Sequence, residues 1–505
     1  MKRITYSCIL LILVGLTLGS CKKPRSDIGA ILFKETKNKV FKKVDSVAYY
    51  KVFKELLAAE KDNLSNSSLI QEFYTTNGYE PYFIVNFTKD KQLLNVVDHY
   101  AQAPAHGLSP ELFNHAELAP LVAKLYGKKD IKTVDEAYKV IARTELLTAN
   151  SLIKYATAMQ YGIVNPRKIF ARYYMKTAKP DSAFMQKVFA ITDIKSFLDT
   201  IQPSGDQYKK LQAALASNYI YTGMTAEETK KVIGLNLERL RWKNKPTTDR
   251  YVWVNIPDYM LTYVENGKPA LTMKVCVGKG PEQSQADADF DESEESVRPH
   301  NHTTPQLSSA INNAQVNPVW NIPESIAKNE IYAHVMKDPY YLVNNSINVY
   351  TKSGSQVDAD DIDWSDVDKN NIPYSFKQAP GDDNSLGKIK FQFPNSSSVY
   401  LHDTPAQKPF ALPVRAVSHG CVRVEKPLEL AHALFGDGEK YNLVKEEMTE
   451  SNPSARDISL SQPVPVFLDY MTAFADAAGQ VQIRPDVYKL DDVLYRRIRK
   501  ALAYK

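Results

Sequence analysis

Tyr259-Met-Leu-Thr-Tyr-Val-Glu-Asn-Gly-Lys-Pro-Ala-Leu-Thr-Met-Lys-Val-Cys-Val277 is the stretch that separates two kinds of structure in this chain. Within it, Asn266-Gly267 is a dipeptide that favours a two-residue type I′ turn, and apolar and polar residues alternate on both sides. Tyr251 to Ile256 alternates in the same way. The pattern predicts a strand followed by a β-hairpin, so a β-rich domain begins near residue 246.

The chain before this point has a mostly helical pattern. Thr133-Val-Asp-Glu136 and Thr225-Ala-Glu-Glu228 are capping boxes, and each precedes apolar residues at helical spacing. Aromatic residues cluster at 73–83 and 170–174, where a core is a more common explanation than a glycan-binding platform. We predict a helical scaffold domain over 46–216 and a connecting helix within 217–245.

Length and charge narrow the class of protein. At 505 residues the chain is long enough for several domains, each with its own core. The net charge of +5 is small, and acidic and basic residues are interspersed, so a nucleic-acid partner is not expected. A polyanionic wall or a membrane surface is compatible with this charge.

The first residues resemble an export signal. Lys2 and Arg3 precede an apolar run from Cys8 to Leu18, and the ending Leu18-Gly-Ser-Cys21 resembles a bacterial lipobox. We expect a lipoprotein signal peptide over 1–20, a lipid on Cys21, and a tether over 21–45. Such a protein would be periplasmic and anchored to a membrane, most simply the periplasmic face of the outer membrane. An ordinary secretory peptide or an uncleaved anchor is the alternative.

Two cysteines remain for the folded part of an exported chain. Cys276 lies in an alternating strand pattern, where a small buried hydrophobic residue is the simpler explanation. Cys421 follows Gly420 in a polar loop, which is a poor place for a packing residue and a good one for a nucleophile. Exported proteins normally pair spare cysteines, so an unpaired one indicates a use for its thiol.

Two polar segments interrupt the β-rich part. Residues 281–299 are strongly acidic but lack the ligand spacing of a calcium loop, which favours a solvated insertion. His300 and His302 follow it without a third ligand in register, so no metal site is expected. Residues 338–374 are again acid-rich and are interpreted as a lid-like capping insertion rather than core strand.

The remaining strands and helices surround Cys421. Strand patterns return at 388–393 and 399–401, which places His402 at a strand end. The catalytic domain is therefore predicted over 246–450. Residues 451–505 are predicted to form a last hairpin, from 464–474 and 481–483, and a basic terminal helix that packs on the other domains.

A thiol is mostly protonated at neutral pH and needs a nearby imidazole to act as a nucleophile. His402 and His419 are the candidates close in sequence, and Gly420 allows backbone amides to turn toward a developing oxyanion. A buried cysteine with two structural histidines is the alternative that spacing alone leaves open.

His402 followed by Ser418-His-Gly-Cys421 and Arg423 resembles the signature of bacterial L,D-transpeptidases with the YkuD-type catalytic domain. Asn384-Ser-Leu-Gly-Lys-Ile-Lys-Phe391 and Tyr400-Leu-His-Asp-Thr-Pro405 are similar to the long, YcbB-like branch, and 146–162 resembles its scaffold. The resemblance implies an α+β fold, with a helical scaffold domain and a β-rich catalytic domain that carries a lid, and it implies no cofactor.

The resemblance also implies a reaction on peptidoglycan stem peptides. Cys421 would attack the carbonyl of the third residue of a tetrapeptide stem, expel D-alanine, and pass the acyl group to a neighbouring stem as a 3→3 cross-link. His402 would be the base, oriented by a backbone carbonyl near Asp403, and His419 and Gly420 would shape the loop and the oxyanion site. The substrate-binding residues implied by the family motifs are Tyr400, Trp320, Arg423, Asp403, Ser418 and Asn384.

The chain departs from that branch in two places. Residues 213–225 join scaffold and catalytic parts directly, without the peptidoglycan-binding module that many members carry, and the acidic loop has no counterpart. Three other functions stay open: an L,D-carboxypeptidase, an inactive wall-binding scaffold and a general cysteine peptidase. An active transpeptidase would contribute to cell-wall biogenesis and cell shape and would be a carbapenem target.

Overall fold

The computed structural model describes residues 26–244, 246–281 and 302–503. The predicted signal peptide, Cys21, His300 and residues 282–299 of the acidic loop lie outside these ranges. Among the described residues, none of the helices combines the length and the apolar character needed to cross a bilayer.

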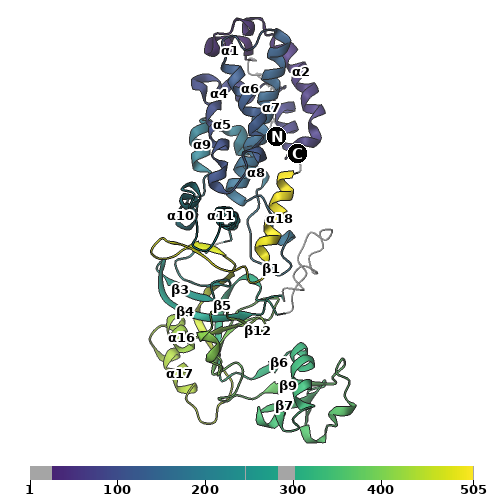
Figure 1. Cartoon of the computed structure of the whole chain (residues 1–505), viewed down its shortest axis with the longest axis vertical. Helices are drawn as coiled ribbons and strands as arrows, with labels where there is room; N and C mark the ends of the chain where they lie inside the picture. Colours follow the sequence, from purple (N-terminus) through teal and green to yellow (C-terminus); the bar gives the residue numbers. More distant parts are fainter. Residues whose placement is uncertain (1–25, 245, 282–301, 504–505) are drawn as a thin grey trace, which may run out of the picture. The chain divides into compact units, whose positions relative to one another are not determined.

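By compactness the chain divides into two units (Figure 1). Unit 1 takes its described residues from Met1–Asn95, Glu117–Asn150 and Thr192–Ile194, and unit 2 comprises Val96–Ala116, Ser151–Ile191 and Lys195–Lys505. The sequence placed a boundary near residue 216, whereas this division assigns 96–116, 151–191 and 195–216 to the same unit as the sheet.

Unit 1 is helical and has an aromatic core. Phe53, Tyr74 and Phe83 are fully buried, and the rings of Phe53 and Tyr74 meet edge to face with centroids 4.7 Å apart. Glu145 is buried beside them and accepts hydrogen bonds from the backbone amides of Phe83 and Ile84 at the start of α4. The core interpretation is therefore confirmed for Tyr74 and Phe83 of the cluster at 73–83. The helices of unit 1 are α1 Ile28–Thr36, α2 Ser46–Ala59, α3 Ser67–Thr76 and α4 Tyr82–Phe87.

Further helices lie in unit 2 or have residues in both units. The capping box at Thr225 is confirmed, because the Thr225 hydroxyl accepts from the Glu228 amide and the Glu228 carboxylate accepts from the Thr225 amide. The helices with residues in both units are α5 Leu93–Ala101, α6 His115–Tyr126, α7 Val134–Tyr161 and α9 Ile194–Thr200. The helices that lie in unit 2 alone include α8 Ser182–Gln186, α10 Asp206–Ala216, α11 Ala226–Arg241 and α18 Leu490–Ala503.

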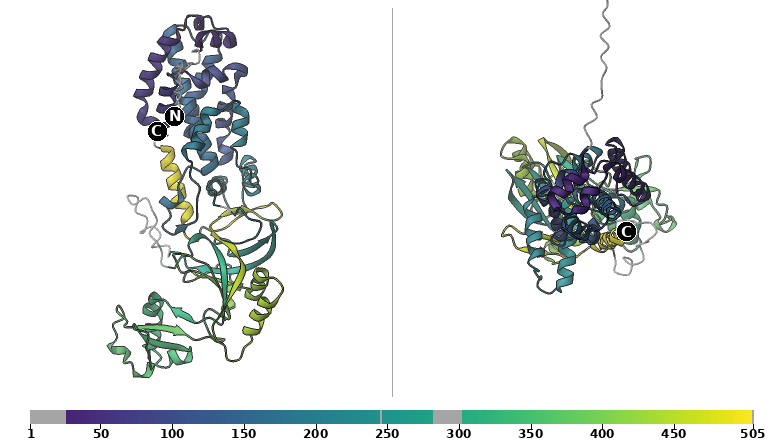
Figure 2. Two further views of the ribbon diagram at one scale, coloured as in Figure 1. Left: turned by 180° about the vertical axis from the view of Figure 1, so that it is seen from behind. Right: turned by 90° about the horizontal axis from the view of Figure 1, so that it is seen from above.

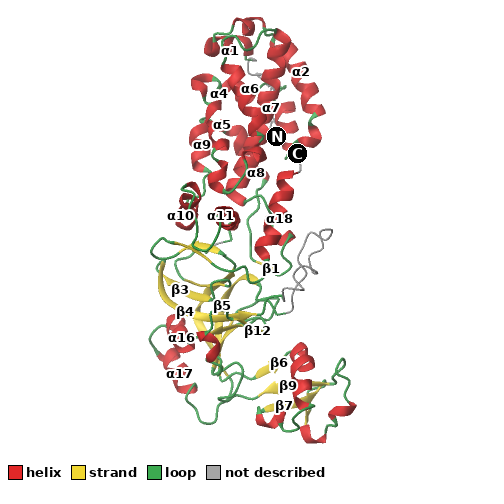
Figure 3. Cartoon of the chain, viewed as in Figure 1, coloured by secondary structure: helices red, strands yellow, loops and turns green. Residues whose placement is uncertain are grey.

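A ten-stranded sheet forms the centre of unit 2 (Figure 3). Its order is β1-β5-β10-β11-β13-β4-β3-β2-β14, β12 pairs with β4, and β14 also pairs with β5, so the sheet closes on itself like a barrel. The predicted hairpin is confirmed: β3 pairs with β4, and Asn266 and Gly267 both have positive φ, as a type I′ turn requires. The bounds are β1 Tyr173–Tyr174, β2 Tyr251–Asn255, β3 Met260–Glu265, β4 Lys268–Gly278, β5 Gln306–Val316, β10 Ile389–Gln392, β11 Leu401–His402, β12 Ala416–Ser418, β13 Val422–Val424 and β14 Arg456–Asp469.

The core of this sheet consists of the alternate residues that face inward, such as Val254, Leu261, Val275 and Val422. Two helices, α16 Pro427–Phe435 and α17 Glu439–Glu447, add Leu430, Leu434 and Val444 to the same core and cover one side of the barrel (Figure 2). A helical unit and a β-rich unit together confirm the α+β fold class.

Residues 320–378 fold as a capping subdomain with a sheet of its own, in the order β6-β9-β7-β8. Ile322, Val349 and Phe376 are buried in its separate core. The insertion predicted over 338–374 adds no strand to the barrel, but it is more than a loop, because its short alternating runs pair with each other and bury one face. Its elements are β6 Trp320–Ile322, α13 Glu324–Ile326, a π-helical turn Ala327–Ile331, α14 Tyr332–Val335, α15 Tyr341–Asn344, β7 Ile347–Thr351, β8 Gln356–Val357 and β9 Tyr374–Gln378.

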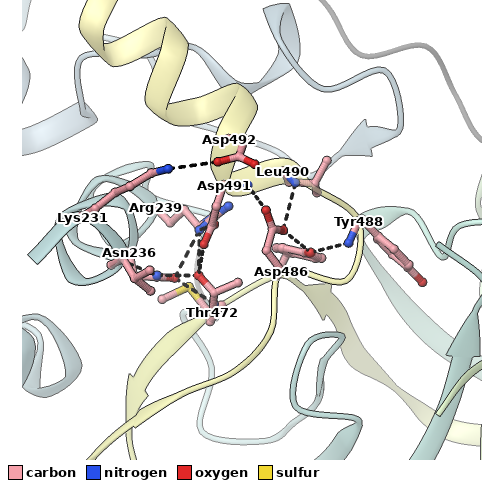
Figure 4. Close-up of polar contacts among 12 residues, drawn as sticks. Lys231, Asn236, Arg239, Thr472, Asp486, Tyr488, Leu490, Asp491 and Asp492 are labelled. Atoms are coloured by element: carbon pink, nitrogen blue, oxygen red, sulfur yellow. Dashed lines mark hydrogen bonds and ion pairs between the residues drawn. The ribbon is translucent and has the colours of Figure 1, made fainter. Parts of the chain in front are cut away.

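The C-terminal part also differs from expectation. Residues 464–469 belong to β14, a long barrel strand, and the last hairpin is formed only by β15 Ala473–Ala475 and β16 Val481–Ile483. In the terminal helix α18, Val493, Leu494 and Ile498 face inward as predicted. At its start, Asp491 accepts from the Thr472 hydroxyl and pairs with the buried guanidinium of Arg239 (Figure 4).

Candidate active site

Cys421 lies between β12 and β13, one residue before β13 begins. Strand β13 pairs in parallel with β11, in the register Leu401 to Val422 and His402 to Arg423, and the amide of Val422 donates to the carbonyl of Tyr400 at 3.0 Å. Cys421 is a partly exposed residue with a free thiol. Register therefore places His402 of β11, and Tyr400 just before that strand, beside Cys421.

Cys276 is also a free thiol, but it is fully buried in β4. The prediction that it packs as a small hydrophobic residue agrees with this position. Cys421 is thus the only partly exposed cysteine among the described residues.

The imidazole of His402 is buried and held in one orientation. Its Nδ1 bonds the carbonyl oxygen of Asp403 at 2.6 Å, a backbone contact of the kind that the family resemblance implies. A carbonyl can only accept, so Nδ1 carries the proton and the lone pair is on Nε2. Burial, and then the charge of Arg423, lower the pKa of His402 to about 3. The ring is therefore neutral at physiological pH and can accept a proton through Nε2.

The thiol of Cys421 is also neutral in the resting site. Burial raises its pKa, and this effect is opposed by hydrogen bonds from Tyr400 and by the charges of Lys390 and Arg423. Lys390 lies in β10 opposite His402, with its ammonium 5.5 Å from the centre of the Tyr400 ring. These cations favour the thiolate once a proton acceptor and a substrate are present.

Residues 418–421, the cysteine loop, have a fixed backbone. The Ser418 hydroxyl accepts from the Gly420 amide at 3.2 Å and donates to the Cys421 carbonyl at 2.6 Å. Gly420 has a φ of 121°, which a residue with a side chain rarely adopts. Ser418 is nearly fully buried, so its contribution is to shape this loop.

His419 points its ring toward the capping subdomain. Its Nε2 contacts Oε1 of Glu330 in the π-helical turn, and its ring centre lies 4.8 Å from that of His302. Burial and the neighbouring charge of His419 lower the pKa of His302. Within the described residues, no group of three or more metal-binding side chains is arranged to hold an ion.

The other predicted substrate-binding residues lie in different surroundings. Arg423 is partly exposed, and its Nε is buried without a hydrogen-bond partner among the described residues. The Asp403 carboxylate accepts from the Lys388 amide at 2.8 Å. Trp320 lies in β6 and packs against the core of the capping subdomain.

Asn384, predicted to contact substrate, is buried and bonded to the backbone in this structure. Its side chain is 1% exposed, and its amide group donates to the carbonyls of Pro318 and Ala379, on either side of the capping subdomain. Its Oδ1 accepts from the Leu386 amide at 2.8 Å. Asn384 therefore fixes the two chain segments that enter and leave that subdomain.

Three residues near Cys421 were not found from the sequence. The neighbour of Lys390 on the adjacent strand is set by the strand register. Glu330 and Arg172 come from distant parts of the chain. In the sequence, the only indication of the place of Lys390 was that it precedes Phe391 in a predicted strand.

Comparisons with known proteins identify two domain families in this chain. Residues 249–435 match the YkuD family, described as the L,D-transpeptidase catalytic domain, and residues 68–215 match a family described as a scaffold domain. A curated protein of Haemophilus influenzae named "Putative L,D-transpeptidase" is 29% identical over 430 residues, which are 84% of this chain and 78% of the relative.

A solved structure titled as the Ldtfm-avibactam carbamoyl enzyme matches with 13% identity over 44% of this chain and 50% of that chain. Its TM-score of 0.19 is too low to support an argument about the fold. The scaffold match covers helices of the first half of the chain, and the YkuD match covers most strands of the barrel and includes Cys421. The chain therefore carries a YkuD L,D-transpeptidase catalytic domain together with a scaffold domain.

Proposed function

We propose that this chain forms 3→3 cross-links in peptidoglycan through a thioester on Cys421. The observation that supports this most directly is the parallel register of β11 and β13, which sets a partly exposed thiol beside an imidazole whose Nδ1 is already bonded. An imidazole held in this tautomer can take the thiol proton only through Nε2.

In the first step, Nε2 of His402 accepts the thiol proton and the sulfur of Cys421 attacks the carbonyl carbon of the third stem residue. The carbonyl oxygen becomes an oxyanion, which the Cys421 amide stabilises. The intermediate then breaks the bond to the terminal D-alanine, whose amine takes the proton from His402. This leaves a thioester on Cys421 and a neutral imidazole.

In the second step, the side-chain amine of an acceptor stem attacks the thioester carbonyl. His402 takes a proton from that amine and returns it to the departing sulfur, so the amide of the cross-link forms as the carbon–sulfur bond breaks. Arg423 and Lys390 stabilise the sulfur anion in both steps, since their charges favour the thiolate. The buried, unpaired Nε of Arg423 is also a donor available to a substrate carbonyl or carboxylate.

The test is a product assay with purified full-length chain and a disaccharide tetrapeptide, analysed by mass spectrometry. A dimer with loss of one D-alanine is expected, and Cys421→Ala should form none while keeping its circular dichroism spectrum. Cross-linking by the Ala variant would refute the proposal.

Hydrolysis of the same thioester by water would make the chain an L,D-carboxypeptidase, which the partial exposure of Cys421 permits. The same assay then yields tripeptide in place of dimer. An inactive wall-binding scaffold would give neither product, and Cys421 would gain no carbapenem adduct in an intact-mass measurement.

We also propose that the mature chain is a lipoprotein anchored through Cys21 and facing the periplasm, which rests on the lipobox-like ending Leu18-Gly-Ser-Cys21. Labelling of cells with a fatty-acid probe should mark the unsubstituted chain, and Cys21→Ala should lose the label. Equal labelling of both would refute the anchor.

A further inference from the structure

A segment from the first half of the chain completes one edge of the catalytic barrel. Strand β1 pairs in parallel with β5, in the register Tyr173 to Gln306 and Tyr174 to Leu307. The amide of Gln306 also donates to the carbonyl of Arg172 at 3.1 Å. This segment lies within the residues that match the scaffold family, yet it belongs to the same compact unit as the barrel.

The side chain of Arg172 holds residues 302–305, which we name the strap. Nη1 of Arg172 donates to the carbonyl of Thr303 at 2.5 Å and lies 3.4 Å from its hydroxyl. Thr303 and Thr304 are buried, so the strap lies inside the structure. The guanidinium is also near enough to Cys421 for their charges to interact.

The strap in turn holds the cysteine loop. The Thr304 hydroxyl donates to the carbonyl of Gly420 at 2.8 Å and accepts from the amide of Gly278 at 2.9 Å. Tyr488 fixes the other side, since its hydroxyl accepts from the Thr304 amide and donates to the Gly278 carbonyl at 2.7 Å. A Cβ on Gly278 would lie only 1.8 Å from the carbonyl oxygen of His302, so the strap fits here only against glycine.

The Gly420 carbonyl and the Cys421 amide belong to the same peptide bond. A trans peptide is planar, and its C=O and N–H point in opposite directions. The hydrogen bond from Thr304 therefore also fixes the direction of the Cys421 N–H, away from the strap. An amide in that position is the donor that a developing oxyanion at Cys421 needs.

We propose that Arg172 is a positioning residue for acyl transfer: by holding Thr303 it keeps Thr304 against the Gly420 carbonyl and so aims the Cys421 amide at the oxyanion. The proposal rests on the proposed function for its biological meaning. By this proposal, a residue in the part of the chain that matches the scaffold family affects the reaction at the barrel.

The experiment compares Arg172→Met with Arg167→Met in the full-length chain. Arg167 is a matched control, because its guanidinium also donates to a backbone carbonyl, that of Met175 at 2.9 Å, and not to the strap. Two rates are measured at Cys421 by intact mass: acylation by p-nitrophenyl acetate, which forms an oxyanion, and alkylation by iodoacetamide, which does not.

We expect Arg172→Met to lower the acylation rate about tenfold, less than the hundredfold or more that follows complete loss of an oxyanion donor. Thr304→Val should do the same with no change of charge, and its alkylation rate should stay within about twofold of that of the unsubstituted chain. Arg172→Lys should recover part of the acylation rate, because it retains a charged donor.

Equal acylation of the Arg172→Met and Arg167→Met variants would overturn the proposal. So would a parallel loss of acylation and alkylation in Thr304→Val, since that would indicate general disorder of the loop. The ester assay needs no stem peptide, so a chain that fails to cross-link peptidoglycan still tests the role of Arg172. Failure of the proposed function would appear separately, as absence of dimer from the unsubstituted chain.

Discussion

Nε2 of His419 contacts Oε1 of Glu330, which links the cysteine loop to the capping subdomain. Both side chains are partly exposed, so this ion pair contributes at most about 1 kcal/mol and weakens in salt. The contact lies two residues from Cys421, and it is the point at which a movement of the capping subdomain would reach the loop.

Glu330→Ala should therefore open the site to large reagents. We expect alkylation of Cys421 by a bulky maleimide to become about two- to fivefold faster at low salt. This factor corresponds to the free energy of an exposed ion pair, at most about 1 kcal/mol. The difference should shrink in 0.5 M salt, where such pairs are screened. Glu324→Ala is the control, because Glu324 is an exposed acid of the same subdomain. Equal rates for the two variants would contradict a role for the contact.

The second prediction concerns the resting protonation state of the site. The pKa of His402 is lowered to about 3 and that of the Cys421 thiol is raised, so neither group changes charge between pH 5 and 8. Alkylation of Cys421 by iodoacetamide should then rise steadily with pH and still be increasing at pH 9. The rate is measured by intact mass, with Cys421→Ala as the background for other thiols. A plateau above about pH 6 would instead indicate a preformed thiolate–imidazolium pair.

Much of what could be predicted from the sequence came from local patterns. The turn at Asn266-Gly267 depends on two adjacent residues, the capping box at Thr225 on four, and the Cys421 motif on a short segment, and each could be recognised without knowing the rest of the fold. Their geometry is determined by neighbours along the chain.

The features that were missed depend on distant pairing. Strand β7 has five residues and β6 three, too few for an alternation to stand out from a polar loop, so the sheet inside the predicted capping insertion became apparent only from their pairing with β9. The motif at Asn384 gives the residue type but not the direction of its side chain, so its hydrogen bonds to the carbonyls of Pro318 and Ala379 could not be predicted. Lys390 and Arg172 reach Cys421 through strand register, which no local pattern encodes.

The third prediction concerns the buried ion pair of Arg239 and Asp491, whose side chains are 2% and 8% exposed (Figure 4). Asp491→Ala leaves the guanidinium charge buried without its partner, which typically costs about 3–5 kcal/mol of unfolding free energy. Asp492→Ala is the matched control, since the neighbouring carboxylate pairs with Lys231 in a half-exposed position and should cost under about 1 kcal/mol. Denaturant unfolding followed by circular dichroism measures both. Similar losses in the two variants would contradict this account of the pair.

The last prediction concerns Glu145 in unit 1. Burial raises its pKa to about 7 from an ordinary value of 4.5, although the Tyr74 hydroxyl and three backbone amides, those of Ile84, Phe83 and Tyr82, oppose the shift. When folding raises the pKa of a carboxyl, its contribution to the free energy of unfolding is most favourable below pH 4.5. That contribution is lost as the pH rises through 7. The loss is at most about 3.5 kcal/mol, because each pH unit between the two pKa values corresponds to about 1.4 kcal/mol. Glu145→Gln cannot ionise but can still accept from the amides of Phe83 and Ile84, so its unfolding free energy should change less between pH 5 and pH 8 than that of the unsubstituted chain. Thermal unfolding at the two pH values tests this, and an identical pH dependence in both proteins would show that Glu145 is already ionised in the fold at pH 5.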